Sequence, residues 1–127
     1  MAGCILVVDD DPIMRELLRI HLSNAGYDVA VAQDGLEAGY GLLRSRRPDL
    51  IISDVNMPHM DGFEFIAALK EEAQFRSIPV IFLTSATEAE YRGKELGAVA
   101  YLAKPVRADK LLALVAEHVE GGRVPIG

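Results

Sequence analysis

Five short apolar runs recur along the chain, and each is followed by a segment whose apolar residues have helical spacing. The runs are rich in aliphatic and β-branched residues, which is typical of strands that are buried on both faces of a sheet. They occupy residues 4–8, 29–32, 50–54, 79–83 and 99–103. Because strands and helices alternate, the pattern predicts an α/β fold in which helices cover both faces of a parallel sheet.

Capping and turn residues mark the ends of the intervening helices. Asp11 suits an N-cap with Pro12 at the first helical position, and Gly26 ends this first helix. A second helix is predicted to begin at Asp34 with Gly35 and to end before Pro48. A third begins at a capping box of Asp61 with Glu64 and runs to about residue 72. A fourth begins at a capping box of Thr87 with Glu90 and ends at Gly97.

Apolar residues at helical spacing predict which helix faces pack against the sheet. In the first helix they are Met14, Leu17, Leu18, Leu22 and Ala25, and His21 lies on the same face. In the second they are Ala38, Leu42 and Leu43, and in the last Leu111, Leu112, Val115 and Val119. The single cysteine, Cys4, lies on an apolar strand and is expected to be a buried core residue.

Length and charge limit the class of protein. A chain of 127 residues fits one domain, expected at 1–120, with 121–127 as a flexible tail or the start of a linker. A net charge of −6 argues against direct nucleic-acid binding, because phosphate backbones attract basic surfaces. No apolar run reaches the ~20 residues of a membrane span and no secretory signal is visible, so we expect a soluble cytoplasmic protein without a membrane partner.

Polar side chains stand where four of the predicted strands end: Asp9 with Asp10, Asp54, Thr84 and Lys104. The carboxyl ends of parallel strands share one edge of the sheet, where open α/β folds bind their ligands, so these side chains should converge. Carboxylates ~4 Å apart repel by about 4 kcal/mol at an effective dielectric of ~20. A cluster of hard oxygen ligands therefore predicts a Mg²⁺ site, with Mn²⁺ as a substitute.

A metal ion beside a carboxylate, an ammonium and a hydroxyl can support phosphoryl transfer. Asp54 would then be the nucleophile and would form an acyl phosphate. Each residue alone is better explained as a cap, a turn or a surface charge, and Asp11 and Asp61 are assigned to caps. The functional hypothesis depends on the joint placement of the others.

The chain resembles the receiver domains of bacterial two-component response regulators over nearly its whole length. Four motifs in this order carry the resemblance: VVDDDP at 7–12, SDVNMPHMDG at 53–62, FLTSA at 82–86 and GAVAYLAKP at 97–105. The resemblance implies a doubly wound, flavodoxin-like five-stranded sheet of order 2-1-3-4-5. It also implies a phosphoacceptor in a phosphorelay, with a sensor histidine kinase or phosphotransfer protein as donor and an effector or fused output domain as recipient.

The resemblance implies a role for each residue of the site. Asp54 matches the phosphoacceptor and Asp10 the direct metal ligand, while Asp9 matches the acid that usually holds the metal through water. The backbone carbonyl of Asn56 would complete the metal site. The remaining matches are the phosphoryl-pairing Lys104, a cis bond before Pro105, the switch hydroxyl of Thr84 and the switch aromatic Tyr101.

Two features of the chain depart from the receiver pattern. Val99 and Ala100 precede Tyr101 where winged-helix regulators often carry acids, and the last helix is largely apolar, so a salt-bridged homodimer of that type is not expected. Ala86 offers no polar side chain toward a phosphoryl group, so the resemblance fixes no lifetime for the phosphorylated state. The stimulus, the kinase, the output and the question whether the receiver stands alone or belongs to a longer regulator stay open.

Two other functions are compatible with part of this pattern. A Mg²⁺-dependent phosphatase with an aspartyl nucleophile needs a second acid two residues after the nucleophile, to act as general acid. This chain has Asn56 at that position, so the general acid is missing. A degenerate receiver that only binds partners would lack part of the site, whereas every acid, the lysine and the hydroxyl are present. A signalling phosphoacceptor that assists its own phosphorylation and dephosphorylation, and is otherwise not an enzyme, is therefore the favoured hypothesis.

Overall fold

The structure is a computed structural model that describes residues 3–44, 47–55, 61–84 and 98–119. Within these ranges the chain forms a parallel sheet of order β2-β1-β3-β4-β5. The strands are β1 (Cys4–Val8), β2 (Asp28–Ala32), β3 (Leu50–Asp54), β4 (Val80–Thr84) and β5 (Ala100–Ala103). The helices are α1 (Pro12–Asn24), α2 (Gly35–Arg44), α3 (Gly62–Glu71) and α5 (Ala108–His118). The predicted doubly wound α/β fold and its strand order are confirmed.

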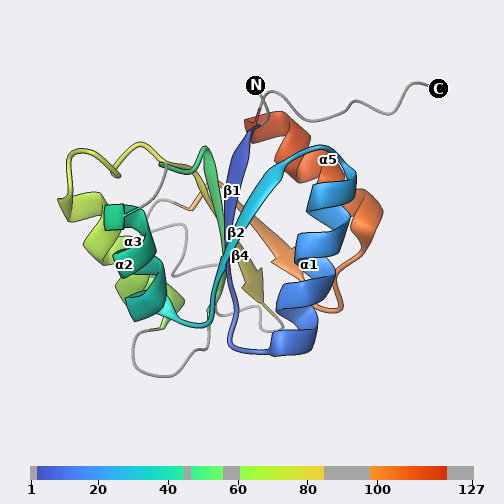
Figure 1. The fold of residues 1–127 in the computed structure, drawn as a ribbon, viewed down its shortest axis with the longest axis horizontal. Coiled ribbons are helices and arrows are strands. Elements are labelled where there is room, and N and C mark those ends of the chain that lie inside the picture. Colours follow the sequence, from blue (N-terminus) through green and yellow to red (C-terminus); the bar gives the residue numbers. More distant parts are fainter. Residues whose placement is uncertain (1–2, 45–46, 56–60, 85–97, 120–127) are drawn as a thin grey trace.

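Helices cover both faces of the sheet, with α1 and α5 on one side and α2 and α3 on the other (Figure 1). Two separate apolar cores result, because successive side chains of a strand point to opposite faces. In β1, Ile5 and Val7 belong to the core beneath α1 and α5, while Leu6 and Val8 belong to the other. β1, β3 and β4 are buried at every position, which explains why their sequences are continuous apolar runs.

The helix ends follow the local sequence signals. The side chain of Asp11 accepts a hydrogen bond from the amide of Ile13, and Gly26 follows α1 with a φ of 98°. Asp61 and Glu64 form the predicted capping box at the start of α3. The helix predicted from Thr87 and the tail at 121–127 lie outside the described residues.

The buried face of α1 is narrower than predicted. Leu18 and Leu22 are buried, but Leu17 is 46% exposed. Leu17 lies about 100° around the helix from Leu18, so a helix that packs on a sheet through one stripe leaves Leu17 in water.

None of the helices in the described ranges is long and apolar enough to cross a membrane.

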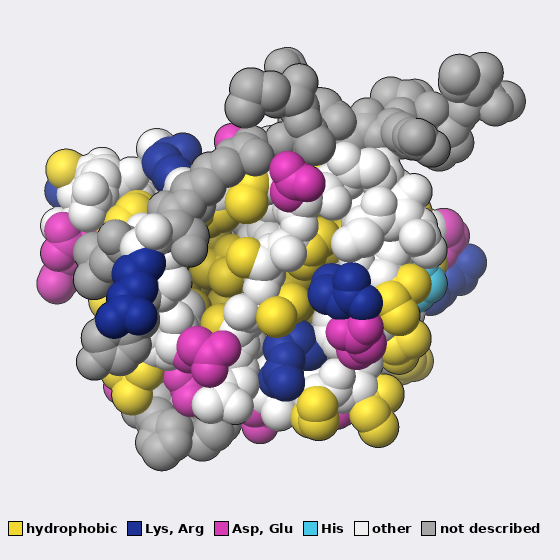
Figure 2. Space-filling model, viewed as in Figure 1, with side chains coloured by type: hydrophobic (Ala, Val, Ile, Leu, Met, Phe, Trp, Pro, Cys, Tyr) yellow, Lys and Arg dark blue, Asp and Glu magenta, His cyan; other side chains and the backbone are white. Residues whose placement is uncertain are grey.

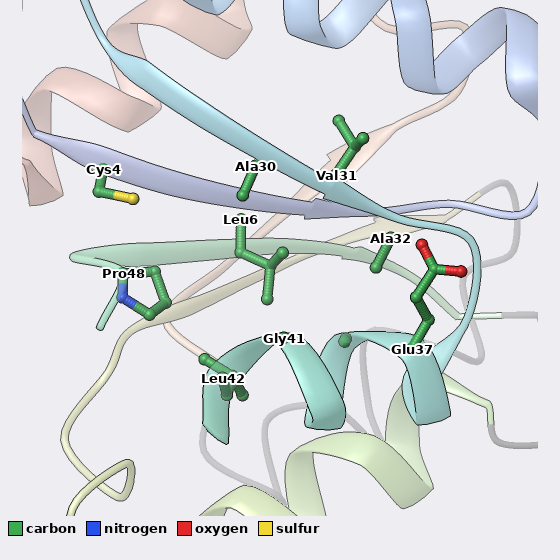
Figure 3. Close-up of a pocket in the computed structure, with 10 residues that line it drawn as sticks. Cys4, Leu6, Ala30, Val31, Ala32, Glu37, Gly41, Leu42 and Pro48 are labelled. Atoms are coloured by element: carbon green, nitrogen blue, oxygen red, sulfur yellow. The ribbon is translucent and has the colours of Figure 1, made fainter. Parts of the chain in front are cut away.

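A hollow of about 130 Å³ lies between α2 and the strands β1 and β2 (Figure 3). Its walls include Leu6, Ala30, Ala32, Gly41, Leu42 and Pro48. Hydrophobic side chains are visible at the centre of this face of the molecule (Figure 2). A β-carbon built on Gly41 would meet no atom within 4 Å, so the packing of α2 does not require a glycine there.

Three glycine-to-alanine substitutions should therefore change the free energy of unfolding in different directions. Gly39→Ala and Gly41→Ala should each stabilise the protein by about 0.5–1 kcal/mol, because alanine favours the helix and neither new methyl group meets a neighbour. Gly62→Ala should destabilise it by about 1–3 kcal/mol, because its methyl group would collide with the carbonyl oxygen of Asp54. Urea unfolding measures all three, and a stabilising Gly62→Ala would contradict the close approach of α3 to β3.

Candidate functional site

The carboxyl ends of β1, β3, β4 and β5 bring the predicted residues to one edge of the sheet. Asp9 follows β1 and is fully buried, Asp54 ends β3 and is 6% exposed, and Asp10 is exposed. One carboxylate oxygen from each of these three acids lies within 4.8 Å of the other two. The convergence that the strand ends predicted is therefore present in the fold.

Lys104 supplies a positive charge at this edge. Its Nζ lies 3.1 Å from Oδ2 of Asp54 and 3.9 Å from Oδ2 of Asp9. Its backbone amide donates to the carbonyl oxygen of Thr84 at 3.0 Å, which holds the end of β5 against the end of β4. The peptide bond between Lys104 and Pro105 is cis.

Backbone amides orient the two buried carboxylates. The amide of Val55 donates to Oδ1 of Asp54 at 2.8 Å, and the amide of Asp11 donates to Oδ1 of Asp9 at 2.9 Å. In both residues the second carboxylate oxygen, Oδ2, faces the ammonium group of Lys104. Oδ2 of Asp9 is buried and has no hydrogen-bond partner among the described residues.

Gly62 brings the start of α3 against the end of β3. Its amide donates to the carbonyl oxygen of Val55 at 2.8 Å, and a β-carbon there would lie 2.9 Å from the ring of Phe82 as well as colliding with the carbonyl of Asp54. In the sequence, Gly62 stands out only as the last residue of the SDVNMPHMDG motif. The signal was its place next to the capping residue Asp61, but the close approach depends on the neighbouring strand.

The electrostatics of the cluster are unfavourable for two ionised acids. Burial raises the pKa of Asp9 above its usual value, against the lowering effect of the Asp11 amide, and the charge of Asp54 raises it further. Burial also raises the pKa of Asp54, although the charge of Lys104 opposes the rise. One lysine thus leaves part of the negative charge uncompensated.

The donor set fits a hard divalent cation. Carboxylates are ligands that Mg²⁺ prefers, and the site offers two buried ones and one exposed one. Oδ2 of the buried Asp9 accepts no hydrogen bond from the described residues. The other positions around the ion would be filled by carbonyl oxygen and water. Asn56, which was predicted to offer its carbonyl, lies outside the described residues.

The two predicted switch residues lie on neighbouring strands. Thr84 is buried at the end of β4, and Tyr101 is half-buried on β5 with its hydroxyl oxygen inside the protein. The ring of Tyr101 packs against that of Phe82 with centroids 6.2 Å apart, and Phe82 meets Phe63 edge to face at 5.3 Å. An aromatic row therefore runs from the start of α3 across β4 to β5.

Comparison with known proteins agrees with this arrangement. The family model of the response regulator receiver domain matches residues 5–116. Response regulator Rre1 of Synechocystis is 40% identical over 114 residues, which cover 87% of this chain and 49% of that protein. The chemotaxis response regulator CheY4 of Vibrio cholerae matches in structure with a TM-score of 0.87 and 38% identity, over 94% of this chain and 100% of that one.

A third relative was solved with a metal ion. It is the receiver domain of the sensor histidine kinase PA1611 from Pseudomonas aeruginosa, with magnesium coordinated in its active site cleft. It matches with a TM-score of 0.84 and 27% identity, over 93% of this chain and 98% of that one.

The chain belongs to the response regulator receiver domain family, the signalling domains that accept phosphoryl groups in two-component systems. It spans about half the length of Rre1.

Removal of the buried negative charge of Asp9 should stabilise the metal-free protein. Asp9→Asn keeps an Oδ1 acceptor for the Asp11 amide and removes the charge, so we expect a gain of about 1 kcal/mol at neutral pH. The raised pKa means that the folded state holds the proton more tightly than the unfolded chain. Wild-type stability therefore falls as pH rises through the folded-state pKa, and the gain from the variant should disappear in acid.

Thermal unfolding with a chelator present, at several pH values, measures this gain. Glu117→Gln, which removes one negative charge from an exposed position of α5, is the matched control and should change little. A loss of stability in Asp9→Asn at neutral pH would show that Asp9 is already well compensated.

Proposed function

We propose that this domain accepts a phosphoryl group on Asp54, in a Mg²⁺-dependent transfer from the phosphohistidine of a sensor kinase or phosphotransfer protein. The observation that carries the proposal is the buried Asp54 carboxylate, with the Lys104 ammonium 3.1 Å away and two further acids beside it. Such a group is both oriented and partly neutralised before any donor arrives.

Asp10 and Asp54 would bind the cation directly, Asp9 would hold it through water, and the carbonyl of Asn56 would complete the set. Mg²⁺ would supply neutralisation of the charge on the phosphoryl oxygens, and Mn²⁺ could replace it. The magnesium ion in the active site cleft of the related PA1611 receiver domain supports a magnesium site here.

In the transfer step a carboxylate oxygen of Asp54 attacks phosphorus. The bond between phosphorus and the donor imidazole breaks, its electron pair stays on the imidazole nitrogen, and Asp54 becomes an acyl phosphate. Lys104 would move its ion pair from the carboxylate to a phosphoryl oxygen, and the hydroxyl of Thr84 would donate to another. The protein assists its own modification and later hydrolysis, and this role differs from multiple turnover of an external substrate.

Intact-mass measurement after incubation with acetyl phosphate tests the acceptor. We expect one added phosphoryl group in the wild type with Mg²⁺, none with a chelator, and none in Asp54→Asn. The modification should be stable in acid and labile in base, as an acyl phosphate is. Equal labelling of Asp54→Asn would refute the acceptor, and sustained turnover of a simple phosphate ester would favour the phosphatase alternative.

We infer further that the signal leaves through one face of the domain, formed by the helix predicted between Thr87 and Gly97, by β5 and by α5. Phosphorylation adds roughly two negative charges and new acceptor oxygens, and Thr84 ends the strand next to that of Asp54. A shift of Thr84 toward the phosphoryl group would leave room beside β5 for the half-exposed ring of Tyr101. The helix predicted between Thr87 and Gly97 lies outside the described residues.

The partner on this face is expected to be a heterologous effector or a fused output domain. The acids that precede the switch aromatic in winged-helix regulators are replaced by Val99 and Ala100. A ligand shifts a two-state element only by its different affinities for the two states, so a minority of the unmodified protein should already hold Tyr101 inward.

NMR spectra with and without beryllofluoride, a stable phosphoryl mimic, test this route. Shifts should extend from Thr84 through Tyr101 into α5, and Thr84→Ala should reduce the distant shifts while those near Asp54 persist. Shifts confined to the metal site, or a tight homodimer through this face, would contradict the proposed route.

A further inference from the structure

Arg15 reaches back from the first turn of α1 to the end of β1. Its amide donates to the carbonyl oxygen of Asp11 at 2.9 Å, which places Arg15 at the fourth position of the helix. Helical side chains lean toward the N-terminus, so a long side chain here points at the loop that enters the helix. Nη1 of Arg15 donates to the carbonyl oxygen of Asp9 at 2.8 Å, in a partly buried setting.

The oxygen that Arg15 holds belongs to the peptide group between Asp9 and Asp10. A peptide group is planar, so a hydrogen bond at its oxygen fixes the orientation of the whole unit and the direction in which the chain leaves toward Asp10. On one side of this unit, the amide of Asp9 donates to the carbonyl of Ala32 and the side chain of Asp9 accepts from Asp11. On the other side stands Asp10, which is exposed and for which no such anchor is seen in the described part of the chain.

We propose that Arg15 is a positioning residue of the metal site: by holding the Asp9 carbonyl it sets the relative placement of the Asp9 and Asp10 carboxylates. This inference rests on the proposed function, because it concerns the same cation. Nothing requires Arg15 to touch the metal or the phosphoryl group, since it acts through the backbone.

A simpler role for Arg15 predicts an effect of opposite sign. If its guanidinium only offset the negative charge of the three acids, removing it would strengthen the binding of a cation by Coulomb attraction. If it positions the ligands, removing it weakens binding, because the ligands must be ordered when the metal binds. The direction of the change in Mg²⁺ affinity therefore separates the two roles.

The experiment compares Arg15→Met with Arg19→Met. Methionine keeps much of the aliphatic stem and removes both the donor and the charge. Arg19 lies one turn further along α1 at the surface, where it pairs with Glu16, so Arg19→Met causes the same change in net charge away from the site. Titration calorimetry with MgCl₂ should show about 10-fold weaker binding for Arg15→Met, as is typical when a residue that supports a ligand is lost, and little change for Arg19→Met.

A second measurement needs no metal. Hydrogen exchange at the amide of Asp11, which donates to Asp9 Oδ1, should be several-fold faster in metal-free Arg15→Met than in the wild type and unchanged in Arg19→Met. If Arg15→Met does not fold, Arg15→Gln serves in its place. Wild-type affinity or tighter binding in the Arg15 variant would overturn this inference alone, whereas a wild type that does not bind Mg²⁺ would overturn the proposed function.

Discussion

The ion pair between Lys104 and Asp54 is the contact on which the rest of the site depends. Desolvation of two carboxylates at the end of β1 and β3 is unfavourable, and the pKa values of Asp9 and Asp54 are raised for that reason. Lys104 arrives from the far edge of the sheet, at the end of β5, with its amide bound to Thr84. The charge that makes buried acids tolerable is thus delivered by the same strand that carries Tyr101.

The positive charge of Lys104 does not fully offset the negative charge of the acids. Lys104 lies 3.1 Å from one acid and 3.9 Å from the other, and a buried oxygen of Asp9 has no hydrogen-bond donor in the described residues. If neutral side chains at this edge would stabilise the fold, as predicted for Asp9→Asn, the acids are explained by the proposed cation site, since function and stability commonly compete. In the proposed function, the same residual charge would attract the cation, and the Asp54 carboxylate would be ionised and able to act as a nucleophile once the cation is bound.

Rigid elements hold the functional groups on three sides. β1 and β3 lie in the middle of the sheet and are buried throughout, so Asp9 and Asp54 have little freedom. The start of α3 presses on Asp54 through Gly62, and the first turn of α1 reaches Asp9 through Arg15. The edge strand β5 is shorter and less buried, which suits the element that is proposed to transmit a change.

Local signals in the sequence predicted the strands and helices of the described ranges, the class of fold and the residues of the candidate site. Continuous apolar runs, capping residues and turn residues are local signals, and the rule that parallel strands end on one edge turns them into a convergent set of Asp9, Asp10, Asp54, Thr84 and Lys104. The structure confirms the fold, and the grouping of the acids with Lys104 follows from it.

Four features could be seen only in the folded protein: the exposure of Leu17, the open space beside Gly41, the close approach of Gly62 to β3 and the hydrogen bond from Arg15 to Asp9. Each of these depends on what lies across a gap from a different element. Sequence periodicity assigns a residue to a helix face but cannot give the width of the contact, and it carries no information about which backbone carbonyl a long side chain will find. Those outcomes are set by packing between elements that are distant in the chain, and local pattern does not encode them.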